Sequence, residues 1–586
     1  MQIAKRITLT FLLLLIALIW ERAIPIYAQS PAPDTIFVGQ FLTLDKAHPK
    51  AQAVAVKSGR IVAVGSEQQV GTLAKQNTRT IRFSGFALPG FADAHIHVAG
   101  VGEELEKLDL RGLTKVEILA KVAKAAQSSP PGTWITGGGW DQGFWHPQVF
   151  PTAKDLNPVS SDHPIALARI DGHSTWVNSK VLHLARITRD TADPSGGMIV
   201  RDAAHEPTGM LVDEAQELIR DVVPKPTHAD EERRIRLAMK QFSKWGLTSV
   251  HDAGVGLETI SIYKDLLSHN ELPVRVYAMA RGNAAINHYL ASGPERDLGN
   301  GMLSVRSFKL FLDGALGSRG AELTNPYSDA PQEHGLELMS DADVERIVVA
   351  ARQKGFQVNT HAIGDLAVRR ALDAFEKGGV TADDRFRIEH ASMVTDEDLP
   401  RFVQMGVIAS IQPVFVGEYG RWAEDRVGHS RVHWVLRTRD LLEAGIPLAA
   451  GTDFPASDTG DPVATLHCAV TRQSAAGMPA GGWYPDQRVD VDQALRMMTA
   501  GPAFAAFEEK NLGSVTVGRY ADFTMLSANP YEIPKDQLKS LTIRMTVVGG
   551  RVTYDATVNH SSAFTARETS KSSRSSAPTR DFSVSE

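Results

Sequence analysis

The chain has 586 residues, 43% of them hydrophobic and 22% charged, as in an ordinary globular protein with enough chain for several domains. The formal net charge of −6, without a basic stripe, excludes the footprint of a nucleic-acid-binding protein, so we expect no nucleic-acid partner. The single cysteine, Cys468, excludes an intramolecular disulfide, and the fold must therefore rest on its core.

The N-terminus resembles an export signal. Lys5 and Arg6 precede a largely apolar run, 9–20, which is too short for a comfortable membrane span. The small residue Ala28 follows at a position that suits cleavage. We therefore expect residues 1–28 to be a signal peptide and the mature protein to be exported, periplasmic or secreted, without membrane contact after cleavage. An uncleaved N-terminal membrane anchor is the alternative.

Two β-rich flanks are expected on either side of a central region. Short apolar strands with glycine and polar breaks occupy residues 33–88, and similar sequence returns in 506–556. We expect the two flanks to pair into one small β-sandwich. The Ser/Thr-rich tail, 557–586, has too few apolar residues to offset its ordering entropy, and we expect it to be disordered.

The central region, 89–505, repeats a unit of amphipathic helix, glycine, short apolar strand and polar residue. The glycines between helix and strand are Gly246, Gly355, Gly406 and Gly445, and glycine suits the left-handed position at a helix C-terminus. Apolar strands alternating with helices predict parallel strands buried on both faces. Polar residues after each strand favour an α/β fold, a (β/α)8 TIM-like barrel with its active site at that end. A doubly wound open sheet is the alternative, but its nucleotide-binding forms would need a glycine-rich phosphate loop.

The segment that follows the first barrel strand is longer than one repeat requires. We expect residues 105–227 to be an insertion over the barrel mouth, where a lid would shape the pocket.

Candidate metal ligands stand at the ends of the predicted barrel strands. His95 and His97 end the first strand, and the alternation of side chains along a strand points both rings to one side. Such a pair alone often arises by chance, but further polar residues end later strands: His361, His390 and Asp453. Four histidines and an aspartate at one end of successive strands suit a borderline divalent ion such as Zn²⁺.

Lys309 is the unusual member of this set, because it lies within an apolar strand. A buried ammonium group is costly. The Lys309 side chain must therefore pair with an opposite charge, lose its proton or be chemically modified. Reaction with CO₂ would turn its amine into a carbamate, whose carboxylate could bridge two metals.

Together these motifs resemble the amidohydrolase superfamily, and most closely amidohydrolase family 3, the group resembling N-substituted formamide deformylases. The resemblance covers about 33–554, and its main segments are 90–97, 308–319, 359–365, 387–390 and 451–455. It implies an inserted segment, a flanking β-sandwich and a centre of one or two divalent ions. By position, one ion would be bound by His95, His97 and Asp453, a second by His361 and His390, and carboxylated Lys309 would bridge them.

The predicted function is metal-dependent hydrolysis of a non-peptide carbon–nitrogen bond in a small amide or N-formyl substrate. A metal lowers the pKa of bound water and polarises the scissile carbonyl, and Asp453 is placed to act as general base and then acid. The candidate substrate-binding residues are His251, Asp171, His173, Arg319 and Trp140. The alternatives are a hydrogen bond within the barrel for His251, a structural ion pair for Arg319 and core packing for Trp140.

Two other functions stay open. The same centre in a lactonase or phosphotriesterase would attack esters, and a non-catalytic binding protein on this scaffold is a further alternative, although it would be expected to lose ligands. The expected partner is a small-molecule substrate, and a homodimer is one option for the assembly.

Overall fold

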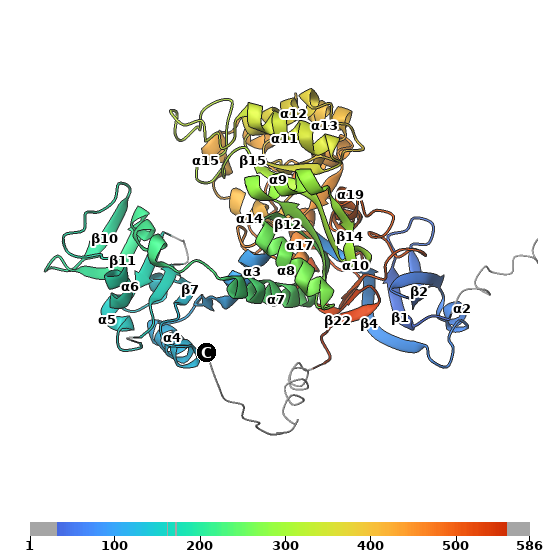
Figure 1. The fold of residues 1–586 in the computed structure, drawn as a ribbon, viewed down its shortest axis with the longest axis horizontal. Coiled ribbons are helices and arrows are strands. Elements are labelled where there is room, and N and C mark those ends of the chain that lie inside the picture. The colour runs from blue at the N-terminus through green and yellow to red at the C-terminus, as the bar shows by residue number, and fades with distance from the viewer. Residues whose placement is uncertain (1–31, 161, 170–172, 559–586) are drawn as a thin grey trace, which may run out of the picture.

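The computed structural model describes residues 32–160, 162–169 and 173–558. The expected signal peptide lies outside the described residues, as do Asp171 and nearly all of the expected tail. Three sheets organise the described part: a barrel, a flanking sheet and the sheet of the inserted segment (Figure 1). Across these ranges, no helix combines the length and the apolar character needed to span a bilayer.

Eight parallel strands form the central barrel, which confirms the predicted fold class. Their neighbours along the sheet follow chain order, from the first strand to the last. The strands are β5 (Phe91–Ile96), β12 (Leu247–Val255), β13 (Arg275–Ala280), β15 (Leu303–Phe311), β16 (Gln357–Ala362), β17 (Arg387–His390), β18 (Ile408–Ile411) and β19 (Leu448–Ala450). Nearly all of their residues are buried, as expected for strands covered on both faces.

Side chains close the seam between the first and last strands. The Asp93 carboxylate accepts hydrogen bonds from the Thr452 backbone amide (3.1 Å) and hydroxyl (2.6 Å). The Asp453 amide donates to the His95 carbonyl at 2.6 Å. At Gly451 a Cβ atom would lie 2.4 Å from the His95 nitrogen, so only glycine allows this approach. The seam therefore places Asp453 beside His95.

Helices cover the outside of the barrel. The longer ones are α7 (His228–Trp245), α8 (Leu257–Ser268), α9 (Gly282–Ser292), α11 (Asp341–Gln353), α12 (Asp365–Lys377) and α17 (Pro462–Thr471), with the shorter α13 (Leu399–Met405) and α16 (Thr438–Glu443). The four glycines of the repeated unit have φ angles between 67° and 83°, which confirms the left-handed conformation expected there.

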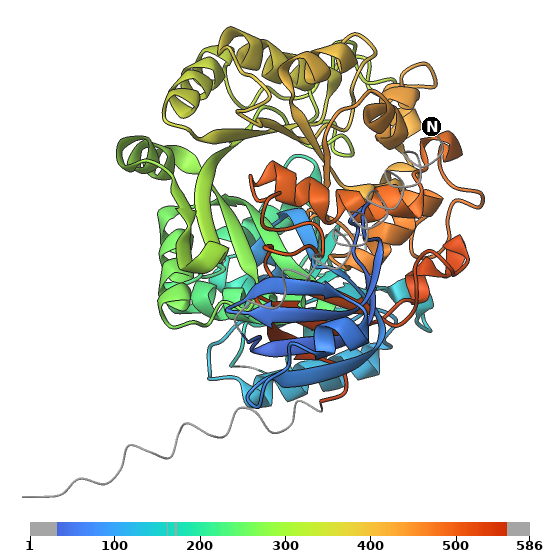
Figure 2. The same ribbon diagram turned by 90° about the vertical axis from the view of Figure 1, so that its right-hand side faces the viewer.

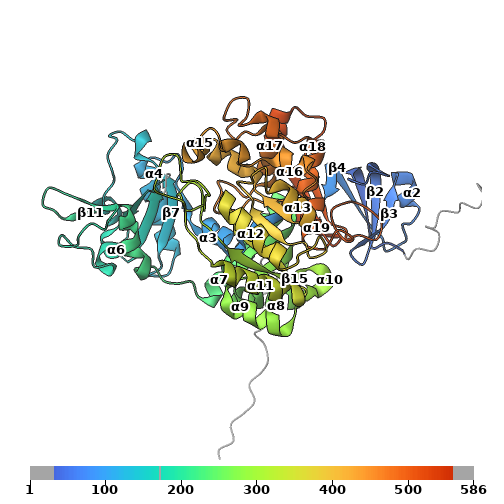
Figure 3. The same cartoon turned by 90° about the horizontal axis from the view of Figure 1, so that it is seen from above.

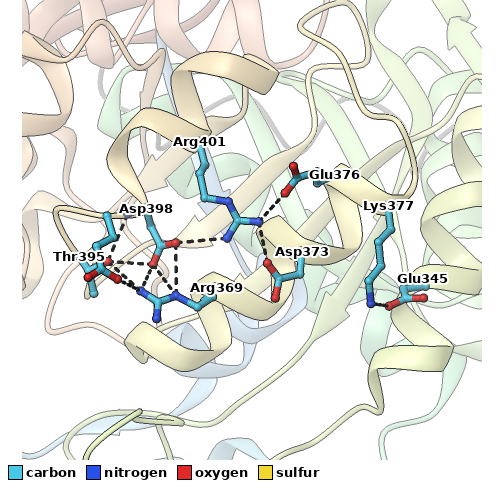
Figure 4. Close-up of polar contacts among 9 residues, drawn as sticks. Glu345, Arg369, Asp373, Glu376, Lys377, Thr395, Asp398 and Arg401 are labelled. Atoms are coloured by element: carbon cyan, nitrogen blue, oxygen red, sulfur yellow. Dashed lines mark hydrogen bonds and ion pairs between the residues drawn. The ribbon is translucent and has the colours of Figure 1, made fainter.

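A network of ion pairs ties α12 to α13. Asp398 is almost fully buried and accepts hydrogen bonds from Arg369 and Arg401, while Arg401 also reaches Asp373 and Glu376 (Figure 4). These contacts fix the outer layer behind the strands that end at the site.

The two flanks pair with each other, as predicted, and the expected β-sandwich takes the form of one continuous seven-stranded sheet (Figure 2). Antiparallel pairing of β4 with β20 joins them. The strands are β1 (Thr35–Leu42), β2 (Lys50–Lys57), β3 (Arg60–Gly65), β4 (Arg79–Pro89), β20 (Phe523–Leu526), β21 (Ile543–Val548) and β22 (Arg551–Asp555). A buried ion pair of Arg275 with Asp522, 2.7 Å, holds the sheet to the barrel.

The inserted segment forms a sheet of its own, with a separate core around Trp140 and Trp176. Its strands are β6 (Leu108–Asp109), β7 (Ile135–Trp140), β8 (Ile165–Arg169), β9 (Ser174–Val177), β10 (Gly197–Arg201) and β11 (Pro207–Asp213). Figures 1 and 3 show it on the side of the barrel opposite the flanking sheet. The chain leaves through α3 (Val98–Glu106) and returns through α7, and these helices contact each other: Glu106 pairs with Arg233 at 2.7 Å.

Candidate metal centre

A cavity of about 430 Å³ opens where the barrel strands end. All six predicted ligands line it: His95, His97, Lys309, His361, His390 and Asp453. They come from β5, β15, β16 and β17 and from the turns after β5 and β19, so residues far apart in the chain meet at one end of the sheet. The structure thus brings together every residue that the sequence singled out as a metal ligand.

Asp453 is the centre of the first group of side chains. Its Oδ1 lies 3.0 Å from His97 Nε2 and 3.3 Å from His95 Nε2. Burial raises the pKa of Asp453, but the two neighbouring imidazoles outweigh burial and hold this pKa well below its usual range. Asp453 is therefore a carboxylate, the form that binds cations.

His361 and His390 form the second group, with ring centroids 4.4 Å apart. The His390 ring also lies 4.7 Å from the His95 ring, which joins the two groups. His390 and Asp453 have φ angles of 73° and 61°, and non-glycine residues seldom adopt this left-handed region. Such strained backbone concentrates at functional sites, where it aims a side chain that regular strand geometry would turn away.

A second layer of polar residues orients the histidines, and sequence reasoning missed it. Glu389 Oε2 lies 2.5 Å from His95 Nδ1, and Glu389 Oε1 lies 2.8 Å from Arg387 Nε. Gln412 Oε1 lies 3.0 Å from His390 Nδ1. Each contact occupies Nδ1, so that Nε2 is the nitrogen left to face an ion, as second-layer partners arrange in metal sites.

One sequence signal for this layer was available. In the segment Arg387-Ile388-Glu389-His390, alternation along the strand places Arg387 and Glu389 on one face, and two charges there would have to pair. Both side chains are completely buried. That Glu389 contacts His95, nearly three hundred positions away, follows only from the closed barrel.

The protonation states of His361 and His390 suit a divalent cation. Burial and Lys309 act to lower the pKa of His95, but Glu389 and Asp453 outweigh them and raise it. Burial lowers the pKa of His390 to about 3, and burial with the neighbouring His390 and Lys309 lowers the pKa of His361 well below its usual value. Neutral imidazole is the form that metals require. In the part of the chain that the structure describes, buried His361 Nε2 has no hydrogen-bond partner. Ligand atoms of His95, His390 and Asp453 lie within 4.8 Å of one another, so this donor set fits a bound ion.

Lys309 has no carboxylate partner within ion-pair distance among the described residues. Its Nζ lies 3.4 Å from His95 Nε2, and its side chain is buried. Burial lowers the pKa of Lys309 to about 8, because the charged form loses its hydration. A pKa of about 8 leaves a minority of the Lys309 amine neutral, and therefore reactive, at neutral pH.

The candidate substrate-binding residues lie elsewhere. His251 is buried deeper in the barrel, with Nδ1 3.0 Å from Arg387 Nη1. Arg319 pairs with Asp329 at 2.9 Å, and His173 with Asp213 at 2.8 Å on the surface of the inserted segment. None of the three lines the cavity.

Trp140 is fully buried in the core of the inserted segment, where its Nε1 donates to the Leu167 carbonyl. Asp171 lies outside the described residues. These positions favour the structural alternatives for Trp140, His251 and Arg319. Local sequence could not predict them, because it gives neither the direction in which an insertion extends nor the depth of a strand residue in the barrel. Their contact with a substrate, and the lid role of the insertion, stay predictions.

The remaining cavity wall comes from residues that the sequence analysis did not identify. They are Phe311, Ile363, Phe415, Glu418, Tyr419 and Trp422, together with small residues of the turns after β15 and β19. Most of them follow β18, in a segment without hydrophobic periodicity.

Comparison with known proteins matches this geometry. A family model described as "Amidohydrolase family" matches residues 85–554. The protein YtcJ of Bacillus subtilis is 33% identical over 534 residues, which cover 89% of this chain and 99% of that protein. N-substituted formamide deformylase of Arthrobacter pascens is 28% identical over 88% of this chain and 97% of its own length. The crystal structure of an uncharacterized metal-dependent hydrolase from Pyrococcus horikoshii superposes with a TM-score of 0.71 at 29% identity, covering 86% of this chain and 99% of that one.

Proposed function

Since the chain belongs to the amidohydrolase family, we propose that it hydrolyses a non-peptide carbon–nitrogen bond in a small amide or N-formyl compound. One observation carries this proposal: six side chains from separate strands converge on one cavity. Burial lowers the pKa of His361 and of His390 there, which favours the neutral form that binds a metal. The similarity to an N-substituted formamide deformylase supports the choice of bond.

The centre would hold one or two divalent ions, with Zn²⁺ the expected ion for a set of imidazole and carboxylate donors. The residues that would hold them are His95, His97, Lys309, His361, His390 and Asp453. When bound, the ion lowers the pKa of water and polarises the carbonyl group.

Asp453 carries the proton in the proposed reaction. As a carboxylate it accepts the proton of the attacking water while the water oxygen bonds to the carbonyl carbon. As a carboxylic acid it then donates this proton to the leaving nitrogen while the carbon–nitrogen bond breaks. The products are a carboxylate, or formate, and an amine. Its contacts with His95 and His97 keep the carboxylate in one orientation.

We also propose that Lys309 becomes carboxylated. The neutral amine attacks CO₂, a nitrogen–carbon bond forms, and one proton leaves to solvent, which gives a carbamate. Burial without a carboxylate partner and a pKa lowered to about 8 support this step. Carboxylation would add 44 Da at Lys309, and native mass spectrometry of the protein under CO₂ would detect the gain.

The proposed export rests on the sequence of residues 1–28. N-terminal sequencing of the protein recovered from outside the cytoplasm tests it. A new terminus at about Gln29 is expected, and an intact protein found only in the cytoplasm would contradict export.

A substrate panel tests the hydrolase proposal. The protein is stripped with a chelator, reloaded with Zn²⁺ and assayed against formamides, amides, lactones and phosphotriesters. We expect turnover of amides or formamides, loss of that turnover after chelation and recovery after reloading. Turnover of lactones or phosphotriesters alone would favour an ester hydrolase, and stoichiometric metal without any turnover would favour a binding protein.

A further inference from the structure

One wall of the cavity is aromatic. Phe415, at the end of η4 (Pro413–Phe415), stacks on the His390 ring, with 6.2 Å between centroids and 8° between planes. Tyr419, at the end of α14 (Val416–Tyr419), stacks on Phe415 at 5.4 Å and 7°, and Trp422 lies 4.6 Å from Tyr419. The rings therefore lead away from the metal centre in one row. Aromatic faces carry negative potential and attract cations, most strongly when both are desolvated.

Glu418 stands on the same wall, on α14 between Phe415 and Tyr419, and lines the cavity. Its side chain is more than half buried, yet its carboxylate forms no hydrogen bond or ion pair with any residue of the described ranges. Burial raises the pKa of Glu418, with the charges of Asp458 and Asp453 adding to the effect and Arg421 opposing it. An unpaired, partly desolvated carboxylate costs free energy, which a cationic ligand would recover.

Acidic residues outnumber basic ones around the entrance. Apart from Lys309, which belongs to the metal centre, no lysine or arginine lines the cavity within the described ranges. Beyond Trp422 the surface has a second hollow of about 580 Å³, which is lined by Glu424, Asp425 and Asp486 and by one basic residue, Arg421. A negatively charged approach of this kind raises the local concentration of cations and disfavours anionic substrates.

We infer that the substrate carries a positively charged nitrogen some atoms away from the scissile bond, held by the Glu418 carboxylate against the Phe415–Tyr419–Trp422 wall. This inference rests on the proposed hydrolysis for its reaction, but the binding contact has its own test. It makes Glu418 the specificity-determining residue of the site.

Paired substrates test the inference on the Zn²⁺-loaded protein. Each member of a series of N-formyl-α,ω-diaminoalkanes of increasing chain length is compared with the N-formylalkylamine of the same length. For at least one length, wild type should show a kcat/KM for the charged member about 10- to 100-fold above that for the neutral one. Glu418→Gln should bring this ratio close to one. The matched control is Asp425→Asn in the outer hollow, which should change the ratio about twofold or less.

Two results would overturn the inference while leaving the hydrolase proposal intact: a ratio near one in wild type at every length, or a ratio preserved in Glu418→Gln with normal metal content. If neither formamides nor other amides are hydrolysed, the hydrolase proposal fails instead, and a binding measurement then tests the inference. Calorimetry then compares choline with its uncharged isostere 3,3-dimethylbutanol. Choline binding that is stronger in wild type and lost in Glu418→Gln supports the cation site, and equal binding of the two probes refutes it.

Discussion

We expect Glu389 to orient His95 for metal binding, and this role can be tested without an activity assay. Its carboxylate holds His95 Nδ1 at 2.5 Å, so Glu389→Gln loses the charge that fixes the tautomer of His95. We expect the dissociation constant for Zn²⁺, measured by competition with a chromophoric chelator, to rise about 10- to 100-fold. Glu418→Gln removes a carboxylate from the same cavity without touching a ligand, and it should bind Zn²⁺ like wild type. Equal affinities for all three proteins would remove Glu389 from this role.

Asp453 is expected to carry the reacting proton. Asp453→Asn keeps an oxygen donor of the same shape but cannot accept a proton, so the variant should retain its fold and its metal and lose about 10²- to 10⁴-fold in kcat. The control is Asp458→Asn, an exposed neighbour that does not line the cavity. Both are assayed with an uncharged amide. Turnover of Asp453→Asn close to that of wild type would show that another group moves the proton.

The candidate metal ligands could be chosen from the sequence because each lies at or near the C-terminal end of a locally recognisable strand. Their second layer and the cavity wall could not. Glu389 meets His95 only because the barrel closes, and the Phe415–Trp422 wall belongs to a segment whose path is set by the surrounding helices. His251 follows the same strand pattern as the candidate ligands, yet it does not line the cavity, because position along a strand also sets depth.

At the scale of elements, the glycine of the repeated unit offers a matched pair of substitutions. Gly246 and Gly445 have the same φ of 83° at helix ends. A Cβ at Gly246 would lie 2.7 Å from Thr524 and 2.8 Å from Ile543, whereas nothing lies within 4 Å at Gly445. In both alanine variants the left-handed backbone should lower the free energy of unfolding by about 1–2 kcal/mol. In Gly246→Ala the clash with the flanking sheet should lower the free energy of unfolding by about 1–3 kcal/mol more.

Urea-induced unfolding, followed by circular dichroism, measures this difference. The midpoint should fall in the order wild type, Gly445→Ala, Gly246→Ala. Equal midpoints for the two variants would mean that Thr524 and Ile543 move aside without lowering the stability. The flanking sheet would then pack less tightly on α7 than the structure indicates.

The repeated unit was readable because its signals are local: hydrophobic spacing, a glycine and a short apolar run recur together. For the closing of the sheet, the sequence predicted only the fold class, a barrel, and not the contacts that close it. The seam between the first and last strands depends on the hydrogen bond of Thr452 with Asp93. These two residues lie at opposite ends of the barrel sequence, and no local pattern predicts such a pair.

At the scale of the whole molecule, the inserted segment should be separable from the barrel. It has its own sheet and core, and the helices at its two ends already contact each other through Glu106 and Arg233. Gly102 approaches the Arg234 carbonyl so closely that a Cβ would lie 2.0 Å away. We therefore expect a protein in which a short glycine-rich linker replaces residues 108–226 to fold and to bind Zn²⁺ as wild type does.

Circular dichroism and metal analysis of this shortened protein provide the check. A folded, metal-loaded product whose turnover falls would point to substrate contacts in the insertion, such as those predicted for Asp171 and His173. An aggregated product, or one without metal, would show that the barrel depends on the insertion, against the division into separate cores.

The central claim is that six side chains from across the barrel form one divalent metal centre. Anomalous X-ray diffraction from crystals of the Zn²⁺-loaded protein, recorded on both sides of the zinc absorption edge, tests it most directly. The account predicts an anomalous peak bounded by His95, His390 and Asp453, with any second peak between His361 and Lys309. Crystals that contain zinc but show no anomalous density among these residues would contradict it.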